Sequence, residues 1–101
     1  MHIIIGADGS VTLDQPADFT AFDIRAVEST QAAVLDALGD RGAAAPERDH
    51  IFVTVAAVRD LAGGAVDSAW EAGFEAMMGY AASKGWLDDA GSSIKAHIDP
   101  S

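Results

Sequence analysis

Residues 66–84 read VDSAWEAGFEAMMGYAASK and hold the clearest periodic pattern in the chain. The larger apolar side chains recur every three or four residues, as on one face of a helix; they are Val66, Trp70, Phe74, Met77, Met78 and Ala81. Gly85 follows, and glycine commonly ends a helix. The stretch therefore predicts a long amphipathic helix over 66–84 whose apolar face is buried.

A strand and a short helix are predicted just before this stretch. Residues 51–55, IFVTV, are the most β-prone run in the chain, and their apolar residues fall on both alternations. This pattern predicts a central strand that is covered on both faces. Val55, Val58 and Leu61 are spaced by three, which predicts a short helix over about 56–62 that ends at Gly63-Gly64.

The N-terminal part contains a predicted hairpin followed by an ambiguous segment. Residues 2–5 and 11–13 are strand-like runs on either side of Asp8-Gly9, a dipeptide that suits a tight turn. Residues 20–26 alternate apolar and polar side chains as a half-buried strand does. Phe19, Phe22 and Ala26 also have helical spacing, so a helix is the competing interpretation.

Three further segments complete the secondary-structure prediction. Residues 30–39 are expected to form a helix capped by Ser29 and ended by Gly39, and residues 40–49 a surface loop. Trp86-Leu87 and residues 94–98 flank a turn-rich stretch, which predicts a C-terminal hairpin. The expected fold is a single α+β domain, residues 1–101, with a small, largely antiparallel sheet packed on the helix 66–84 and one or two shorter helices.

Composition narrows the classes of function. The chain has 16 Asp plus Glu against 6 Lys plus Arg, a formal net charge of -10. Such a charge repels nucleic-acid phosphates and anionic lipid surfaces, so we expect neither as a partner. The chain has no cysteine, which excludes disulfides and thiolate metal sites. No export signal is visible, and we expect a cytoplasmic protein.

Two patterns resemble ligand sites but are incomplete. Asp67, Glu71 and Glu75 follow one another at helical spacing, but a single exposed row supplies too few inward oxygens for a metal, so we interpret it as a solvated face. Gly63-Gly64 precedes a helix, yet no phosphate-binding glycine motif is present. We therefore expect no metal and no cofactor.

The three histidines supply the only weak candidates for catalysis. His97 and Asp99 are two residues apart on a predicted strand, hence on one side of it, where the carboxylate could orient the imidazole as in a general base. His50 is the third weak candidate, and it stands next to a predicted strand.

Bulky side chains are concentrated in one short part of the sequence and lead to the main functional hypothesis. This set of candidate partner- or ligand-binding residues comprises Trp70, Phe74, Met77, Met78, Tyr80 and Trp86. A chain this small is not expected to bury all of them, so part of the set should meet a protein partner or a second copy of the chain. The first hypothesis is thus a non-catalytic interaction module that self-associates or joins a larger assembly. The alternative is a small enzyme or ligand-binding protein with an apolar pocket and a His or Asp acid–base group.

Overall fold

The computed structural model describes residues 1–100 and has a mixed α+β fold built on one six-stranded sheet. The strands are β1 (His2–Ile5), β2 (Val11–Asp14), β3 (Asp23–Ala26), β4 (Gly42–Ala44), β5 (His50–Thr54) and β6 (Ser93–Pro100). The α-helices are α1 (Gln31–Leu38), α2 (Val55–Ala62) and α3 (Ser68–Ser83), and the short 3-10 helices are η1 (Gly39–Arg41) and η2 (Gly63–Ala65).

The sheet is mixed, and its strand order is β2-β1-β3-β6-β5-β4. The N-terminal hairpin β1–β2 is antiparallel, as predicted. β1 and β3 are parallel, β3 and β6 are parallel, and β6 and β5 are antiparallel. The expectation of a largely antiparallel sheet is therefore wrong, because two of its five pairings, β1–β3 and β3–β6, join parallel strands.

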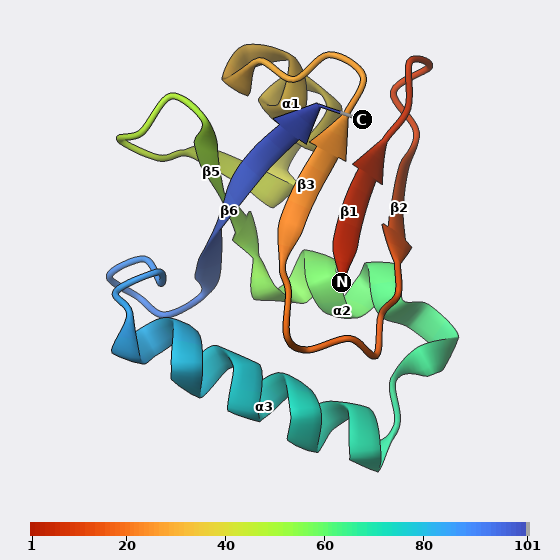
Figure 1. Cartoon of the computed structure of the whole chain (residues 1–101), viewed down its shortest axis with the longest axis vertical. Coiled ribbons are helices and arrows are strands. Elements are labelled where there is room, and N and C mark those ends of the chain that lie inside the picture. The colour runs from red at the N-terminus through yellow and green to blue at the C-terminus, as the bar shows by residue number, and fades with distance from the viewer. Residues whose placement is uncertain (101) are drawn as a thin grey trace.

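The predicted C-terminal hairpin does not form as such. Trp86-Leu87 contributes only an isolated bridge from Leu87 to Ile94, while residues 93–100 make one long strand. Ile94, Ala96 and Ile98 of this strand are all buried in the hydrophobic core. It lies in the middle of the sheet, between β3 and β5 (Figure 1).

The strand predicted at 51–55 exists as β5, but it is neither central nor covered on both faces. Ile51 and Val53 are buried, whereas His50, Phe52 and Thr54 are only partly buried on the opposite face. β5 is second from the edge because residues 42–44, expected to lie in a loop, form the edge strand β4. The expected loop over 40–49 is thus wrong for its first half.

Residues 20–26 adopt the strand interpretation over a shorter span. β3 covers Asp23–Ala26, with Ile24 and Ala26 buried, while Phe19 and Phe22 lie in the preceding loop. No helix forms over this segment.

Helices α1 and α2 pack on one face of the sheet, and α3 runs across one end of it (Figure 1). The predicted Ser29 cap of α1 is wrong by one residue, since the Thr30 side chain accepts the hydrogen bond from Ala33 N. Thr54 caps α2 in the same way, and α2 ends at Gly63, as predicted, where φ is 50°. Hydroxyl side chains at these positions satisfy a backbone N–H that the first turn leaves free.

The long predicted helix is present as α3 and is two residues shorter at its start. Asp67 caps it by accepting a hydrogen bond from Trp70 N at 2.8 Å. Trp70, Phe74, Met77 and Ala81 are its buried residues and join the sheet in one hydrophobic core. The Trp70 indole stacks on Phe74 and donates to the carbonyl of Pro16 at 2.8 Å, which ties α3 to the loop between β2 and β3. Within residues 1–100, no helix is both long enough and apolar enough to cross a membrane.

Candidate functional site

The sheet has one face that no helix of residues 1–100 covers, which we call the open face. Figure 1 shows α1 and α2 behind β6, β3 and β1, whose fronts face the viewer. A row of titratable side chains crosses this face because their residues are register partners on five adjacent strands. The row consists of Asp14, His2, Asp23, His97 and His50. All three histidines of the chain therefore lie on the open face.

At the N-terminal end of this row, His2 and Asp23 are in close contact. His2 Nδ1 lies 2.6 Å from Asp23 Oδ1, and His2 is buried. Arg25 Nε is 3.7 Å from the same oxygen. This end of the row fastens β1 to β3 and presents little free imidazole surface.

The other end forms a group that we call the histidine cluster, made of Asp49, His50, His97 and Asp99. The rings of His50 and His97 meet edge to face with centroids 5.0 Å apart. Asp49 joins them, with Oδ1 2.8 Å from His50 Nδ1 and Oδ2 3.2 Å from His97 Nε2. The hydrogen bond with the His50 ring is the largest effect that holds the pKa of Asp49 below its usual range, and His97 acts in the same direction.

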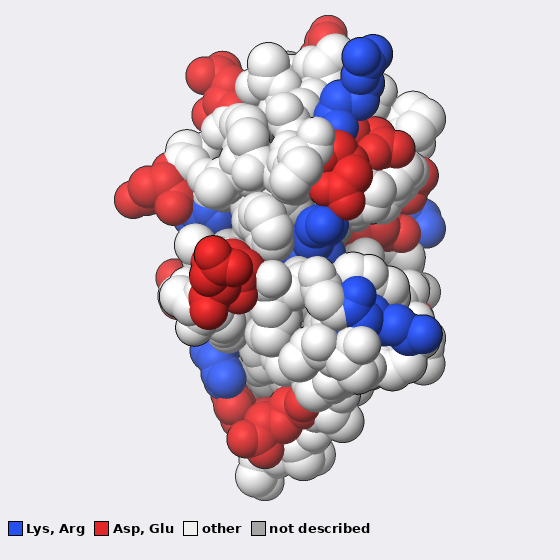
Figure 2. Space-filling model, turned by 90° about the vertical axis from the view of Figure 1, so that its left-hand side faces the viewer, with Lys and Arg blue, Asp and Glu red and all other residues white. Residues whose placement is uncertain are grey.

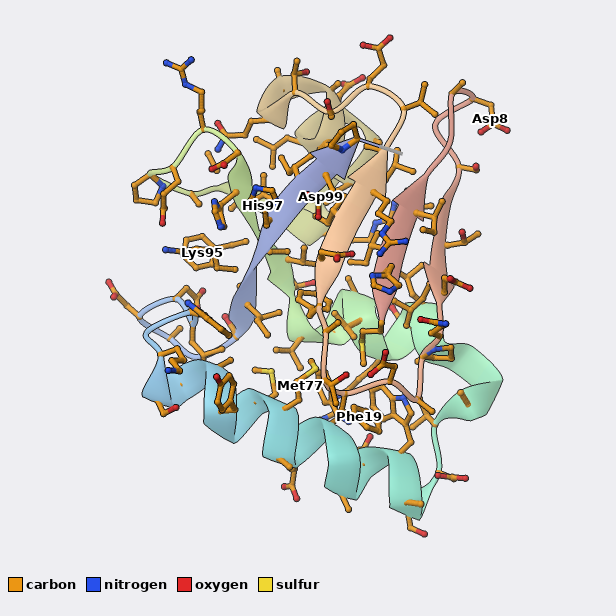
Figure 3. All side chains as sticks on the ribbon, viewed as in Figure 1. Asp8, Phe19, Met77, Lys95, His97 and Asp99 are labelled. Carbon is orange, nitrogen blue, oxygen red and sulfur yellow. The ribbon has the colours of Figure 1, made fainter. Side chains whose placement is uncertain are left out.

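The structure brings His97 and Asp99 together, as the alternation along the strand predicted. His97 Nδ1 is 3.0 Å from Asp99 Oδ1. In Figure 3 both side chains project from β6 on the viewer's side. Each nitrogen of His97 therefore lies close to a carboxylate, and the contact of Nε2 with Asp49 has the geometry of a hydrogen bond.

The loop that carries Asp49 is held in place by Gln31 at the start of α1. The two N–H groups of Gln31 Nε2 are shared among the backbone carbonyls of Ala45, Glu47 and His50, at 3.1, 3.2 and 2.8 Å. The loop also accepts from β6, since Ile98 N donates to Asp49 O at 2.7 Å. These contacts fix where Asp49 stands relative to β6.

Beside the histidine cluster, an aromatic groove runs between the sheet and α3. Its main side chains are Phe19, Phe22, Met77, Tyr80 and Trp86, around a cavity of about 270 Å³. Figure 3 places Phe19 and Met77 together between the loop and α3. Trp86 follows Gly85, whose φ of 75° lets the chain leave α3 and turn back toward β6. The Tyr80 and Trp86 rings meet edge to face, with centroids 5.7 Å apart.

A second cavity of about 210 Å³ connects the aromatic groove with the histidine cluster. It is lined by Phe22, His50, Trp86, Lys95 and His97. Phe22, Trp86 and Lys95 line both cavities, so the two cavities are adjacent.

Lys95 is the one charged side chain that lines these cavities. Lys95 Nζ lies 2.8 Å from Glu47 Oε2, and this hydrogen bond is the largest cause of the lowered pKa of Glu47. Asp49 and Asp99 contact His97, a lining residue of the smaller cavity, but do not line it themselves. Figure 2, which views the molecule from the left of Figure 1, shows acidic and basic side chains interspersed on that side.

The predicted set of bulky residues divides into buried and exposed members. Trp70, with 3% of its surface exposed, belongs to the core together with Phe74 and Met77, and Met78 packs against that core. Tyr80 is 58% exposed and Trp86 is 42% exposed. One of the two tryptophans, Trp86, is thus left at the surface.

The predicted acidic row on α3 has three separate roles. Asp67 is the helix cap, Glu71 pairs with Arg59 of α2, and Glu75 is exposed. Within residues 1–100, no group of three or more His, Asp or Glu side chains is arranged to hold a metal ion.

Reasoning from the sequence missed three residues of this site: Phe22, Asp49 and Gln31. Phe22 was assigned to a strand, although as a loop residue it reaches the cavity. Asp49 adjoins His50, but its contact with His97 depends on the β5–β6 register, which local sequence does not specify.

Comparison with known proteins adds no assignment to this geometry: no protein-family model, no curated protein and no solved structure matches the chain.

Proposed function

We propose that the chain is a non-catalytic interaction module that docks a basic protein partner on its open face and in the aromatic groove. The observation that carries the proposal is the exposed Tyr80–Trp86 pair beside the acidic histidine cluster. Tyrosine and tryptophan are enriched where protein interfaces concentrate their binding energy. Here both line a cavity of about 270 Å³.

Charge favours a basic partner. The formal net charge is -10, and the open face with its bordering loop carries five carboxylates against three cations; these are Asp14, Asp23, Glu47, Asp49, Asp99, Arg25, Arg48 and Lys95. A field of this sign accelerates encounter with positively charged proteins. Self-association through the same face would bring two acidic surfaces together, which is why a basic partner is preferred over a second copy.

A catalytic role for His97 has weaker support. A general base needs a ring nitrogen with an unshared electron pair directed at the substrate. Both nitrogens of His97 face carboxylates instead.

The proposal is tested by mapping where a basic ligand binds. The probe is a capped dodecapeptide of Arg, Lys, Leu, Tyr and Gly, added to ¹⁵N-labelled protein while amide and indole chemical shifts are followed. We expect the largest changes at Trp86, Tyr80 and His97, and none on α1. Changes spread over all acidic residues, or confined to the α1 face, would contradict the proposal.

Two variants complete the test. Tyr80→Ala combined with Trp86→Ala removes exposed rings only, so the fold should persist and peptide affinity should drop at least about tenfold. Val27→Ala removes another exposed apolar side chain, which is 56% exposed, and should leave affinity unchanged. Light scattering on the free protein should give the mass of one chain, 10.4 kDa; a dimer that dissociates in the Tyr80/Trp86 variant would replace the basic partner by a second copy.

A further inference from the structure

We propose that the aromatic groove holds one aromatic side chain of the docked partner, taken from a segment in which basic residues flank that ring. This inference rests on the proposed function and names the group that anchors the partner. The groove has two features that suit such a segment: a largely apolar lining, and carboxylates that stand just outside the lining.

The size and the lining of the cavity suit an inserted ring. Met77, Ala81 and Ile94 line the cavity and are buried in the hydrophobic core. The aromatic lining residues are Phe19, Phe22, Tyr80 and Trp86. The cavity measures about 270 Å³. A cavity of roughly 150 Å³ already holds a benzene molecule, so there is room here for the ring of one side chain.

A charged side chain is a poor occupant of this cavity. Lys95 is its one charged lining residue, and the Lys95 ammonium repels an arginine or lysine that enters. An entering carboxylate gains little from Lys95, because Glu47 already pairs with that ammonium at 2.8 Å. Burying a charge without a partner costs free energy. The inserted group is therefore uncharged and apolar.

Carboxylates lie next to the polar lining residues without lining the cavity themselves. Asp18 accepts a hydrogen bond from the Thr20 hydroxyl at 2.6 Å, and Glu47 accepts one from Lys95. Basic residues of a partner therefore meet opposite charge beside the groove and not within it. This arrangement favours a segment with one apolar residue between two basic ones.

The rings in the lining favour an aromatic residue over an aliphatic one. Aromatic side chains attract one another in edge-to-face and offset-stacked contacts beyond the effect of the area that they bury. Tyr80 and Trp86 are both exposed, so their rings are accessible to a further ring. Met77 adds a thioether, which packs favourably against the edge of a ring.

The test compares three capped pentapeptides by titration of the ¹⁵N-labelled protein. The first is Arg-Gly-Phe-Gly-Arg, and the other two carry cyclohexylalanine or alanine in place of phenylalanine. We expect the phenylalanine peptide to bind about two- to tenfold more tightly than the cyclohexylalanine peptide. It should bind at least about tenfold more tightly than the alanine peptide. The largest shifts should include the Trp86 indole, and equal affinity of the phenylalanine peptide and either other peptide would overturn the proposal.

Paired variants of the two exposed rings locate the site. Tyr80→Leu with Trp86→Leu keeps apolar side chains but removes both rings, so the preference for phenylalanine over cyclohexylalanine should disappear. Tyr80→Phe with Trp86→Phe is the matched control, which keeps two rings and should keep the preference. Retained amide shift dispersion verifies that each variant is folded. A preference that survives in the leucine pair would refute the groove as the site of the ring.

The flanking charges are tested with a fourth peptide, Glu-Gly-Phe-Gly-Glu. Its carboxylates meet Asp18 and Glu47 beside the groove, so it should bind at least about tenfold more weakly than Arg-Gly-Phe-Gly-Arg. Equal affinities of these two peptides would refute the requirement for basic flanking residues.

A second copy of the chain is the competing occupant. In the free protein the Trp86 indole shift should not change with protein concentration. A change that matches the one caused by the phenylalanine peptide would show that a second copy fills the groove, and it would overturn the proposal.

The outcomes also distinguish this inference from the proposed function. If the dodecapeptide maps to the open face and the groove while the phenylalanine and alanine pentapeptides bind equally, the aromatic anchor is refuted and the docking surface stands. If the dodecapeptide does not map there, the proposed function and this inference are both refuted.

Discussion

Gly73 of α3 lies against the ring of Phe19 so closely that a Cβ at position 73 would overlap the ring. Phe19 in turn meets Trp70 edge to face, with ring centroids 5.9 Å apart, and lines the aromatic groove. The width of the groove thus depends on a residue without a side chain in the middle of a helix.

Gly73→Ala should therefore destabilise the protein and disturb the groove, whereas Gly79→Ala should stabilise the protein. At Gly79 an added Cβ meets nothing within 4 Å, so the variant gains about 0.5–1 kcal/mol of helix propensity. At Gly73 the same gain is outweighed by an overpacking cost of about 1–3 kcal/mol. Urea unfolding should rank the variants in the order Gly79→Ala, wild type, Gly73→Ala. A Gly73→Ala protein as stable as Gly79→Ala would disprove the close approach.

Asp67 should matter for stability and Glu75 should not, although both belong to the acidic row seen in the sequence. Asp67→Ala removes the side-chain acceptor for Trp70 N and should lower the free energy of unfolding by about 1 kcal/mol. Glu75→Ala changes an exposed residue and should stay within about 0.5 kcal/mol of wild type. Thermal unfolding measures both; similar losses would contradict the capping role.

Gln31 is expected to stabilise the protein by holding the loop that carries Asp49. Gln31→Ala removes the amide group that donates to the carbonyls of Ala45, Glu47 and His50, so the free energy of unfolding should drop by about 1–3 kcal/mol. Urea unfolding measures this loss. A change within about 0.5 kcal/mol of wild type would contradict the role of Gln31 in holding the loop.

Asp49 should stabilise the folded protein at neutral pH and lose this effect at low pH. Its pKa is lowered in the folded protein, chiefly by the hydrogen bond with His50. Its stabilising effect is then complete above the unfolded value of about 3.9 and is lost as the pH falls through the lower folded value. The difference in unfolding free energy between wild type and Asp49→Asn should accordingly be larger at pH 6 than at pH 2. A difference that is constant over this range would contradict the lowered pKa.

Patterns of residues close together in the sequence correctly predicted helix α3 and the N-terminal hairpin, whose conformations depend mainly on those residues. The helix at 66–84 was correct to within two residues at each end because its apolar side chains repeat with one period over five turns. The N-terminal hairpin was correct because Gly9 adopts the positive φ of 82° that the turn requires.

The sheet order could not be predicted in this way. The turn-rich residues 88–93 fit a hairpin, yet Ile94, Ala96 and Ile98 pair with strands that are far away in the sequence. Parallel pairing of β6 with β3 depends on packing among segments that are far apart in the sequence. No residue pattern within either strand indicates this pairing.

The same distinction applies to the candidate site: a contact within one strand was predicted, and a contact between distant segments was not. His97 and Asp99 were found because alternate residues of a strand share a face. Asp49 was not found, because it is 48 residues from His97 and meets it only through the β5–β6 register. The surplus of aromatic side chains was visible in the sequence, but which tryptophan stays exposed was decided by the Trp70–Pro16 hydrogen bond and the turn at Gly85.

Quenching of tryptophan fluorescence by acrylamide, with and without the basic dodecapeptide, tests the docking surface most directly. In the free protein Trp86 should be quenched and buried Trp70 protected, and the Trp86→Phe variant should lose the accessible component. Saturating dodecapeptide should protect Trp86 in the wild type, while a peptide with Glu in place of Arg and Lys should not. If Trp86 stays equally accessible with the basic dodecapeptide bound, the aromatic groove is not where the partner docks.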